Sequence, residues 1–298
     1  MAPNKGLLLI LISLSLALIF SSCDERTAQK GDSVKDFKID STKSSIVNVS
    51  GKLFSIPSPI QTALLIKQSN AAYNKAVLSN PKDADKYVNK SDRALNLGIY
   101  GADMAYTSFY EDPQESIKYF RALDLLSENL EIKGAVDAGI IKRLSSNLEN
   151  PDSLLILSGK FYEAADVYLK ENERADVAAL ILTGTWIEST MLTALAAKEG
   201  NQNAFARLAQ QKKSINTLSD VLSSLNSDGL MSSILIGQLD SLKASYSEVS
   251  REYEYREPVT YADTKTTRIT STSTYQMSDS VFMDITDRLT RMRNEIIN

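Results

Sequence analysis

Most of the chain carries apolar residues at intervals of three and four, the spacing that places them on one face of an α-helix. Within 83–110, for example, this face consists of Leu95, Ile99, Ala102, Tyr106 and Phe109. Within 278–297 it consists of Val281, Ile285, Leu289 and Met292. The predicted helices are 59–79, 83–110, 113–130, 134–148, 151–171, 174–199, 202–226, 230–252 and 278–297.

Prolines that follow a capping residue predict where several of these helices begin. Ser, Asn and Asp accept hydrogen bonds from free backbone N–H groups at a helix start, and proline is tolerated in the first turn. This signal occurs at Ser58-Pro59, Asn80-Pro81, Asp112-Pro113 and Asn150-Pro151. Glu115 occupies the third helical position after Asp112, so we expect a reciprocal capping box there. Gly200 is a predicted helix end.

Two stretches interrupt the helical periodicity. Residues 24–50 are polar and without sustained periodicity, so we predict a flexible tether. Residues 253–276 are rich in Thr and Tyr, which favours an extended arm or a small hairpin. The predicted fold class is all-α, either a helical bundle or a TPR-like stack of antiparallel helical hairpins, with a short extended arm near 253–276. Leu97-Gly98 matches one pair of the TPR motif, but no fixed period recurs.

The N-terminus has the layout of a bacterial lipoprotein signal. Lys5 precedes the apolar run Gly6–Phe20, which is short for a membrane span, and Phe20-Ser21-Ser22-Cys23 has the pattern of a lipobox. We therefore expect a signal peptide at 1–22 and diacylglycerol and palmitate on Cys23. A lipidated tether at 23–53 and a helical domain at 54–298 would follow.

This lipid would anchor the chain in the cell envelope. The expected location is the outer membrane, on the side that faces the periplasm. Asp24 follows the cysteine, which in enteric bacteria favours retention in the inner membrane, so the choice of membrane stays open.

Composition and charge argue against several classes of chemistry. The net charge is −4 and no cluster of Lys and Arg stands out, so we do not expect nucleic-acid binding. There is no histidine, and the single cysteine is expected to carry lipid. These facts argue against Ser-His-Asp and Cys-His nucleophiles, most zinc sites, haem ligated by histidine, and disulfides. No phosphate-binding or calcium-binding motif occurs, so we expect neither an enzyme nor a bound cofactor or metal.

Glu188 is the most unusual residue of the predicted helix 174–199. The segment 177–197 is otherwise apolar or small, apart from Thr and Ser, so the helix should be buried. A buried carboxylate must be paired, hydrogen-bonded or protonated. Arg93 or a tyrosine hydroxyl would be its partner in a structural pair. Alternatively, Glu188 would anchor a ligand between helices, together with Trp186 and Tyr100.

The helix 83–110 has a second face that is polar and aromatic. Two interpretations fit this face, a solvated surface and a surface that binds a partner or ligand. It consists of Arg93, Asn96, Tyr100, Asp103, Thr107 and Tyr110. Gly98 and Gly101 lie one turn apart in the same helix, which indicates close approach of a neighbouring helix or of a ligand.

Two short segments carry a resemblance to a known group. With the lipobox, Asn96–Asp103 (NLGIYGAD) and Gly184–Glu188 (GTWIE) resemble an uncharacterised group of helical lipoproteins from Bacteroidetes. The resemblance covers about 54–250 and implies a Gram-negative envelope, but no activity.

Three functions fit the sequence. The favoured one is a membrane-tethered, non-enzymatic binding or scaffolding subunit that has an envelope protein as its partner. The second is a small-molecule binding protein with a pocket near Glu188, Trp186 and Tyr100. The third is a hydrolase that uses Asp103 and Glu188, which requires the two carboxylates to lie roughly 5–10 Å apart in an open cleft.

Overall fold

The computed structural model describes residues 45–49, 52–56, 59–68, 70–132, 171–225 and 233–298, with isolated positions between 142 and 169. Cys23 and the predicted tether up to residue 44 lie outside these residues. So do most of the predicted helices 134–148 and 151–171 and the predicted cap at Asn150-Pro151.

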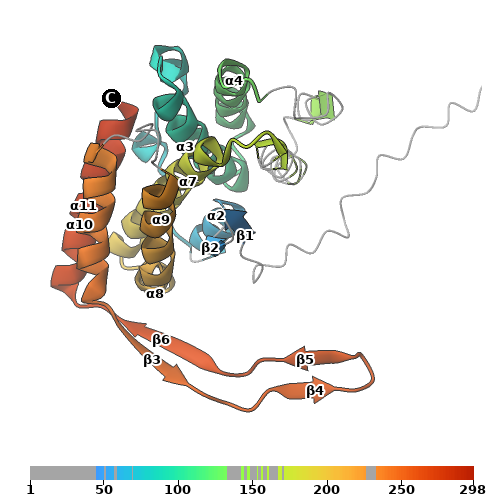
Figure 1. Cartoon of the computed structure of the whole chain (residues 1–298), viewed down its shortest axis with the longest axis vertical. Coiled ribbons are helices and arrows are strands. Elements are labelled where there is room, and N and C mark those ends of the chain that lie inside the picture. The colour runs from blue at the N-terminus through green and yellow to red at the C-terminus, as the bar shows by residue number, and fades with distance from the viewer. Residues whose placement is uncertain are drawn as a thin grey trace, which may run out of the picture. The chain divides into compact units, whose positions relative to one another are not determined.

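Helices dominate the described part of the chain, as predicted for an all-α fold with an extended arm (Figure 1). The α-helices are α2 (Pro59–Gln68), α3 (Lys90–Phe109), α4 (Pro113–Asn129), α7 (Ala175–Lys198), α8 (Gln202–Ala209), α9 (Lys212–Leu225), α10 (Ser233–Ser247) and α11 (Asp279–Ile297). The 3-10 helices are η2 (Lys75–Val77) and η3 (Pro81–Lys86).

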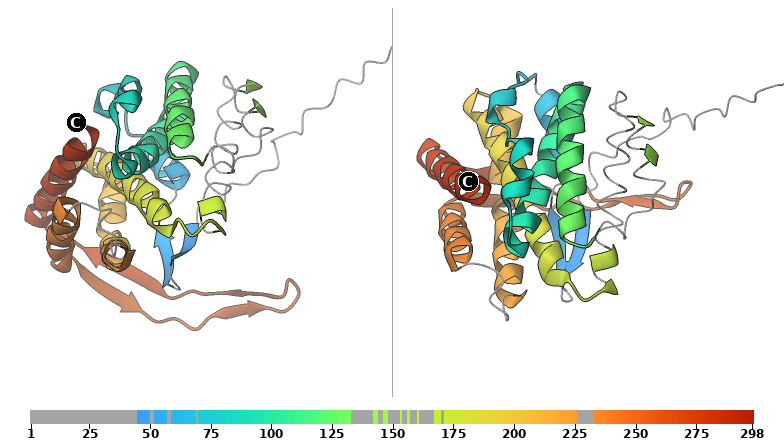
Figure 2. Two further views of the ribbon diagram at one scale, coloured as in Figure 1. Left: turned by 45° about the horizontal axis from the view of Figure 1, so that its top comes forward. Right: turned by 90° about the horizontal axis from the view of Figure 1, so that it is seen from above.

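The helix α7 forms the centre of the hydrophobic core, with α3 packed closely against it (Figure 2). By length and composition α7 could cross a membrane, but 94% of its most apolar window is buried inside the protein, as in a core helix. The prediction that this helix is buried is confirmed. Its end is also confirmed, since Gly200 adopts a φ of 92° just after the last turn.

Two glycines allow α3 and α7 to approach each other. A Cβ atom at Gly98 would lie 2.1 Å from the carbonyl oxygen of Ile181. A Cβ atom at Gly184 would lie 1.9 Å from the carbonyl oxygen of Leu95. The interpretation of Gly98 as a point of close contact with a neighbouring helix is confirmed, and Gly184 makes the reciprocal contact.

Several predicted helices are shorter than expected because capping residues inside them start new elements. Asn80 accepts a hydrogen bond from the N–H of Lys82 and begins η3, so α3 begins at Lys90 rather than near 83. The predicted helix 59–79 ends at Gln68, before Asn70 with its φ of 56°. The predicted helix 202–226 is two helices, α8 and α9.

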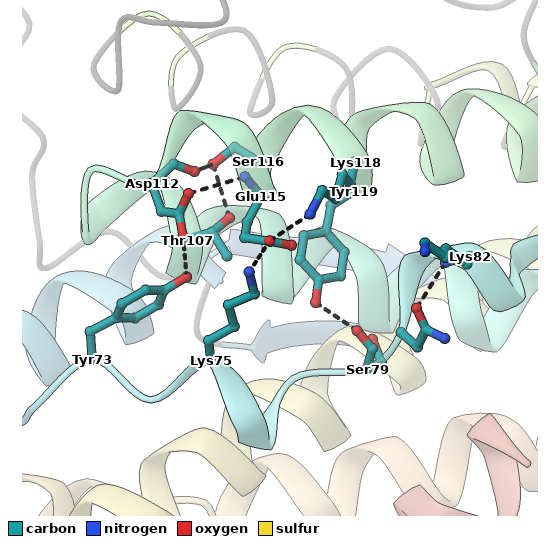
Figure 3. A network of polar contacts seen from close by, with 11 residues as sticks. Tyr73, Lys75, Ser79, Lys82, Thr107, Asp112, Glu115, Ser116, Lys118 and Tyr119 are labelled. Atoms are coloured by element: carbon teal, nitrogen blue, oxygen red, sulfur yellow. Dashed lines mark hydrogen bonds and ion pairs between the residues drawn. The ribbon is translucent and has the colours of Figure 1, made fainter.

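The predicted capping box at the start of α4 is only half formed. Asp112 caps the helix, since its side chain accepts a hydrogen bond from the N–H of Glu115. Glu115 does not return the interaction, because its carboxylate pairs with Lys75 and with Lys118 (Figure 3). The backbone N–H of Asp112, which Glu115 would accept from in a capping box, donates instead to the carbonyl oxygen of Thr107 at 3.0 Å.

The last part of the predicted tether contains an antiparallel hairpin instead of irregular chain. Its strands are β1 (Ser45–Val49) and β2 (Lys52–Ile56), with Ser45 opposite Ile56 and Val49 opposite Lys52. Branched and aromatic residues on both sides of a two-residue Ser-Gly connection are a hairpin signal, which the overall polarity of the region obscured.

The predicted arm is present and forms a two-stranded antiparallel ribbon that leaves the end of α10 and returns to the start of α11 (Figures 1 and 2). At its base, β3 (Ser250–Glu254) pairs with β6 (Thr272–Gln276). Towards its tip, β4 (Val259–Tyr261) pairs with β5 (Thr266–Arg268). We call residues 250–276 the ribbon. It begins at Ser250, so the predicted helix 230–252 ends earlier than expected, at Ser247.

Candidate functional site

A buried ion pair joins α7 to α11 at the centre of the helical part. Glu188 has no exposed surface. Its Oε2 atom accepts a hydrogen bond of 2.6 Å from Nε of Arg293, and its Oε1 atom accepts one of 2.9 Å from Nη2. Two parallel bonds between a guanidinium and a carboxylate form the strongest geometry for such a pair. Glu188 is therefore fully satisfied, as in the structural interpretation.

The partner of Glu188 differs from the one that the sequence suggested. Arg93 does not contact Glu188. It donates to the carbonyl oxygens of Tyr87 at 2.9 Å and Asn129 at 3.3 Å. Arg293 was missed, although it interrupts the apolar face of α11 one turn after Leu289. A cation on a buried helix face is a signal for a buried anion elsewhere in the chain.

Asp103 is the third charged residue of this cluster and has no exposed surface. Its Oδ2 atom accepts hydrogen bonds from the backbone N–H of Ser79 at 3.1 Å and from the Ser79 hydroxyl. Its Oδ1 atom has no donor. Burial and the neighbouring carboxylate of Glu188 raise the pKa of Asp103 well above its usual value, while Arg293 and Ser79 oppose this shift. One guanidinium thus lies near two carboxyl groups, and it donates its hydrogen bonds to that of Glu188.

Asp103 lies close enough to the pair of Glu188 and Arg293 for the three charged groups to influence one another. The backbone N–H and hydroxyl of Ser79 bind Asp103, and Arg293 binds both Glu188 and the carbonyl oxygen of Val77, two residues before Ser79. We call Ser79, Asp103, Glu188 and Arg293 the buried polar cluster.

The buried polar cluster holds the irregular segment around Ser79 against three helices. Arg293 donates to the carbonyl oxygen of Val77 at 3.0 Å, from α11. The hydroxyl of Tyr119, in α4, donates to the carbonyl oxygen of Ser79 at 2.6 Å (Figure 3). Tyr100, in α3, donates to the carbonyl oxygen of Asn80 at 3.0 Å. Side chains from α3, α4 and α11 therefore satisfy the backbone of a segment that has few helical hydrogen bonds of its own.

The polar face of α3 is an interior surface, so the interpretation of it as a solvated face is wrong. Asn96, Tyr100, Asp103 and Thr107 each have 0% exposure. Asn96 donates to the carbonyl oxygen of Ile296 in α11, and the Thr107 hydroxyl lies 2.9 Å from that of Ser116 in α4. Neighbouring elements supply polar partners along this face, although Oδ1 of Asn96 and Oδ1 of Asp103 have none. Only its ends, Arg93 and Tyr110, are partly exposed.

Trp186 takes part in a separate contact. Its ring is 1% exposed, and its Nε1–H donates to Oε1 of Gln211 at 3.0 Å, at the junction of α8 and α9. The fold thus brings Asp103 and Glu188 together, with Tyr100 one turn before Asp103. It separates Arg93 and Trp186 from this group. The ligand group of Tyr100, Trp186 and Glu188 is therefore a set of buried side chains that already have protein partners.

The ribbon, unlike the polar face of α3, has large side chains that are exposed to solvent. Within the described residues, half of the large apolar side chains that are exposed lie on it. They are Tyr253 (58% exposed), Tyr255 (68%), Val259 (44%), Tyr261 (48%) and Ile269 (80%). Only its base touches the helices, where β6 contacts α8 and Tyr275 packs against the core. Clustered exposed apolar side chains of this kind mark interaction surfaces.

Within the residues that the structure describes, no three or more Cys, Asp or Glu side chains are grouped so as to hold a metal ion. Comparison of the chain with protein-family models, with curated proteins and with solved structures finds no significant match.

Proposed function

We propose that this chain is a non-enzymatic binding or scaffolding subunit of the bacterial cell envelope, tethered through a lipid on Cys23, that docks an envelope protein through its ribbon. The observation that carries the proposal is the row of exposed apolar side chains along residues 253–269. The tether adds to it, because holding the ribbon near a membrane-bound partner raises the effective concentration for docking.

The helical part is suited to holding the ribbon, while the ribbon binds the partner. The buried polar cluster pairs Glu188 with Arg293 and holds the segment around Ser79 in place. A rigid helical body then carries the ribbon from its ends at α10 and α11. The aromatic side chains of the ribbon are amphipathic and suited to a protein interface.

The two alternative functions receive less support. A ligand pocket at Glu188 would need a carboxylate free to bind the ligand, but this one is bound by both arms of the Arg293 guanidinium. A hydrolase that uses Asp103 and Glu188 would need an open cleft, and neither carboxylate has any exposed surface.

Docking through the ribbon tip can be tested by extracting the native protein from membranes in mild detergent and crosslinking it. The proteins that co-purify are then identified by mass spectrometry. We expect one stoichiometric envelope protein with the wild type, lost in a Tyr261→Ser, Ile269→Ser variant. The matched control is Ile234→Ser, Met283→Ser, since these side chains are 64% and 58% exposed but lie outside the ribbon. An unchanged partner in the tip variant, or no partner with the wild type, would refute ribbon docking.

The tether is tested separately by a Cys23→Ala variant. We expect this variant to lose its lipid, measured as the mass of the N-terminal peptide, and to lose the co-purifying partner when both are at native levels. A wild-type peptide without added lipid mass would refute the proposed anchor and leave ribbon docking to be judged by the tip variant.

A further inference from the structure

We infer that the base of the ribbon, along the outer edge of β3, is a self-association site that pairs with the same edge of a second copy of this chain. The inference rests on the proposed use of the ribbon as a docking element, and it assigns the base and the tip to different partners. A second copy of the chain is the expected binding partner, because the charge pattern of this edge is complementary to itself.

The outer edge of β3 is unpaired in the part of the chain that the structure describes. The sheet has two strands, β3 and β6, and all five residues of β3 are exposed. Since β3 pairs only with β6 in this sheet, one edge of β3 has no strand beside it, while β6 also contacts α8. Free edges present unpaired N–H and C=O groups that bind another strand, unless charge, proline or a bulge prevents it.

The charges along this edge are complementary to themselves when two copies run antiparallel. The segment Arg251–Glu257 has the sequence REYEYRE, which is symmetric about Glu254 except that opposite charges replace each other. With Glu254 on a two-fold axis, Arg251 of each copy faces Glu257 of the other. In the same arrangement, Glu252 faces Arg256. Opposite charges directly across an antiparallel pair are favourable.

The centre of the segment fits the same arrangement. Tyr253 of each copy faces Tyr255 of the other, and the two rings are now 58% and 68% exposed to solvent. Aromatic cross-strand pairs stabilise antiparallel sheets. Glu254 faces its own copy, which is the one unfavourable pair. The Arg256 side chain already binds this carboxylate at 3.0 and 2.9 Å, and it would reduce the repulsion across the axis.

Backbone geometry excludes most other registers. Opposed residues of an antiparallel ladder turn the same side of the backbone towards each other, so residues pair odd with odd and even with even. A register centred on Tyr253 would place Glu252 against Glu254 twice. A register centred on Tyr255 would place Glu252 against Pro258, which has no N–H to donate. The register centred on Glu254 is the one that pairs every Arg of the segment with a Glu.

An edge of this length forms a small interface, which suits a tethered protein. Small interfaces are weak between molecules in dilute solution. Anchoring two copies to one membrane raises their effective concentration, so that a weak contact is populated there. The tip of the ribbon stays free for the envelope partner in such a pair.

Disulfide trapping tests the register in native membranes. A Glu254→Cys variant places the two new sulfur atoms at the axis, where opposed Cα atoms lie about 4.5–5.5 Å apart, within the range of a disulfide. The matched control is Thr272→Cys, because Thr272 is paired with Glu254 on the adjacent strand. Two copies of residue 272 would lie roughly 14 Å apart, beyond disulfide range.

We expect a covalent dimer on mild oxidation of the Glu254→Cys membranes and none above wild-type background with Thr272→Cys. The native Cys23 is the only other cysteine and is present in all three chains. Equal crosslinking at positions 254 and 272, or none at either, would overturn the inference.

A charge exchange provides a second measurement that does not depend on cysteine. The Arg251→Glu change sets like charges against Glu257, so we expect dimerisation measured by native mass spectrometry of the lipidated chain to weaken roughly tenfold or more. The double change Arg251→Glu, Glu257→Arg restores opposite charges and should restore the dimer. A double variant as monomeric as the single one would contradict the register.

The two proposals fail in different ways. If self-association is wrong, the trapped dimer is absent while the tip variant still loses its envelope partner. If ribbon docking of an envelope protein is wrong, the Tyr261→Ser, Ile269→Ser variant keeps its partner while the Glu254→Cys dimer still forms.

Discussion

The polar face of α3 and the ribbon contain the same kinds of side chain, yet one is buried and the other is exposed. Both are rich in tyrosine and carry acidic and basic residues. On α3, neighbouring elements cover the face, and Asn96, Tyr100 and Thr107 each make a hydrogen bond to one of them. A two-stranded ribbon has no second layer to cover it. Whether a polar, aromatic pattern becomes an interior network or a binding surface thus depends on what packs against it.

The difference has consequences for what each region does. A buried network resists change because removing one member leaves another without its partner in a medium of low dielectric. Substitutions on an exposed ribbon should leave the stability of the folded monomer nearly unchanged. Their effects should therefore be seen in the binding of a partner. The largest change in stability is therefore expected from substitutions in the buried polar cluster, and the smallest from substitutions on the ribbon.

The Arg293→Met variant should produce the largest loss of stability. It leaves Glu188 buried and without its cation, and removing one partner of a buried ion pair costs about 3–5 kcal/mol. The measurement is the free energy of unfolding from denaturant titration. The control is Arg291→Met in the same helix, an exposed side chain, where we expect a change within about 0.5 kcal/mol. Similar values for the two variants would show that the ion pair does not stabilise the fold.

The Asp103→Asn variant should change how stability depends on pH. The folded state raises the pKa of Asp103, so folding takes up a proton once the pH exceeds the ordinary carboxyl pKa of about 3.9. The contribution of Asp103 to stability is therefore full below that pH and is lost as the pH rises towards its folded value. An amide cannot titrate, so the variant should gain stability relative to the wild type by up to about 1.4 kcal/mol per pH unit in this range.

The measurement is the difference in unfolding free energy between the Asp103→Asn variant and the wild type, taken in steps from pH 4 to pH 8. Both chains share every other titratable group, so the difference reports residue 103 together with its effect on Glu188 and Arg293. A difference that stays flat, or that falls as the pH rises, would mean that Asp103 is ionised in the folded protein.

The smallest expected effect comes from changing Tyr to Phe, once at a buried position and once at an exposed position. Tyr100→Phe removes a hydroxyl that donates to the carbonyl oxygen of Asn80, so we expect a loss of about 1 kcal/mol. Tyr255→Phe, on the ribbon, should leave the unfolding free energy unchanged within about 0.5 kcal/mol. Thermal and denaturant unfolding of both variants would check this. Equal losses would erase the distinction between the two regions.

The periodicity of single segments predicted much of the fold. The stripes of three and four located α3 and α11, the long apolar segment at 177–197 indicated the buried helix α7, and the Thr- and Tyr-rich stretch located the ribbon. These features are local, because a helix or strand face is visible within one segment. Errors occurred where a short capping signal competed with a longer periodicity, as at Asn80, or where a polar region concealed a hairpin, as at 45–56.

The partners within the buried polar cluster could not be predicted in the same way. Glu188 is recognisable as an anomaly in its own helix, but Arg93 and Arg293 were both available cations. Arg293 lies 105 positions away in the sequence and reaches Glu188 because α11 packs against α7. Ser79 belongs to the cluster, and Tyr119 binds the carbonyl oxygen of Ser79, through similar contacts between distant segments, and neither residue carries a local signal of this.

By itself, the amino-acid sequence determined which segments form helices, that α7 is buried, and that residues 253–276 leave the helical pattern. Those properties follow from the spacing and size of neighbouring side chains. Only the tertiary structure decided that the polar face of α3 is covered, that Arg293 pairs with Glu188, and that the edge of β3 is free. Those outcomes depend on contacts between distant segments, whose energies are set by packing and by the loss of water around buried charges.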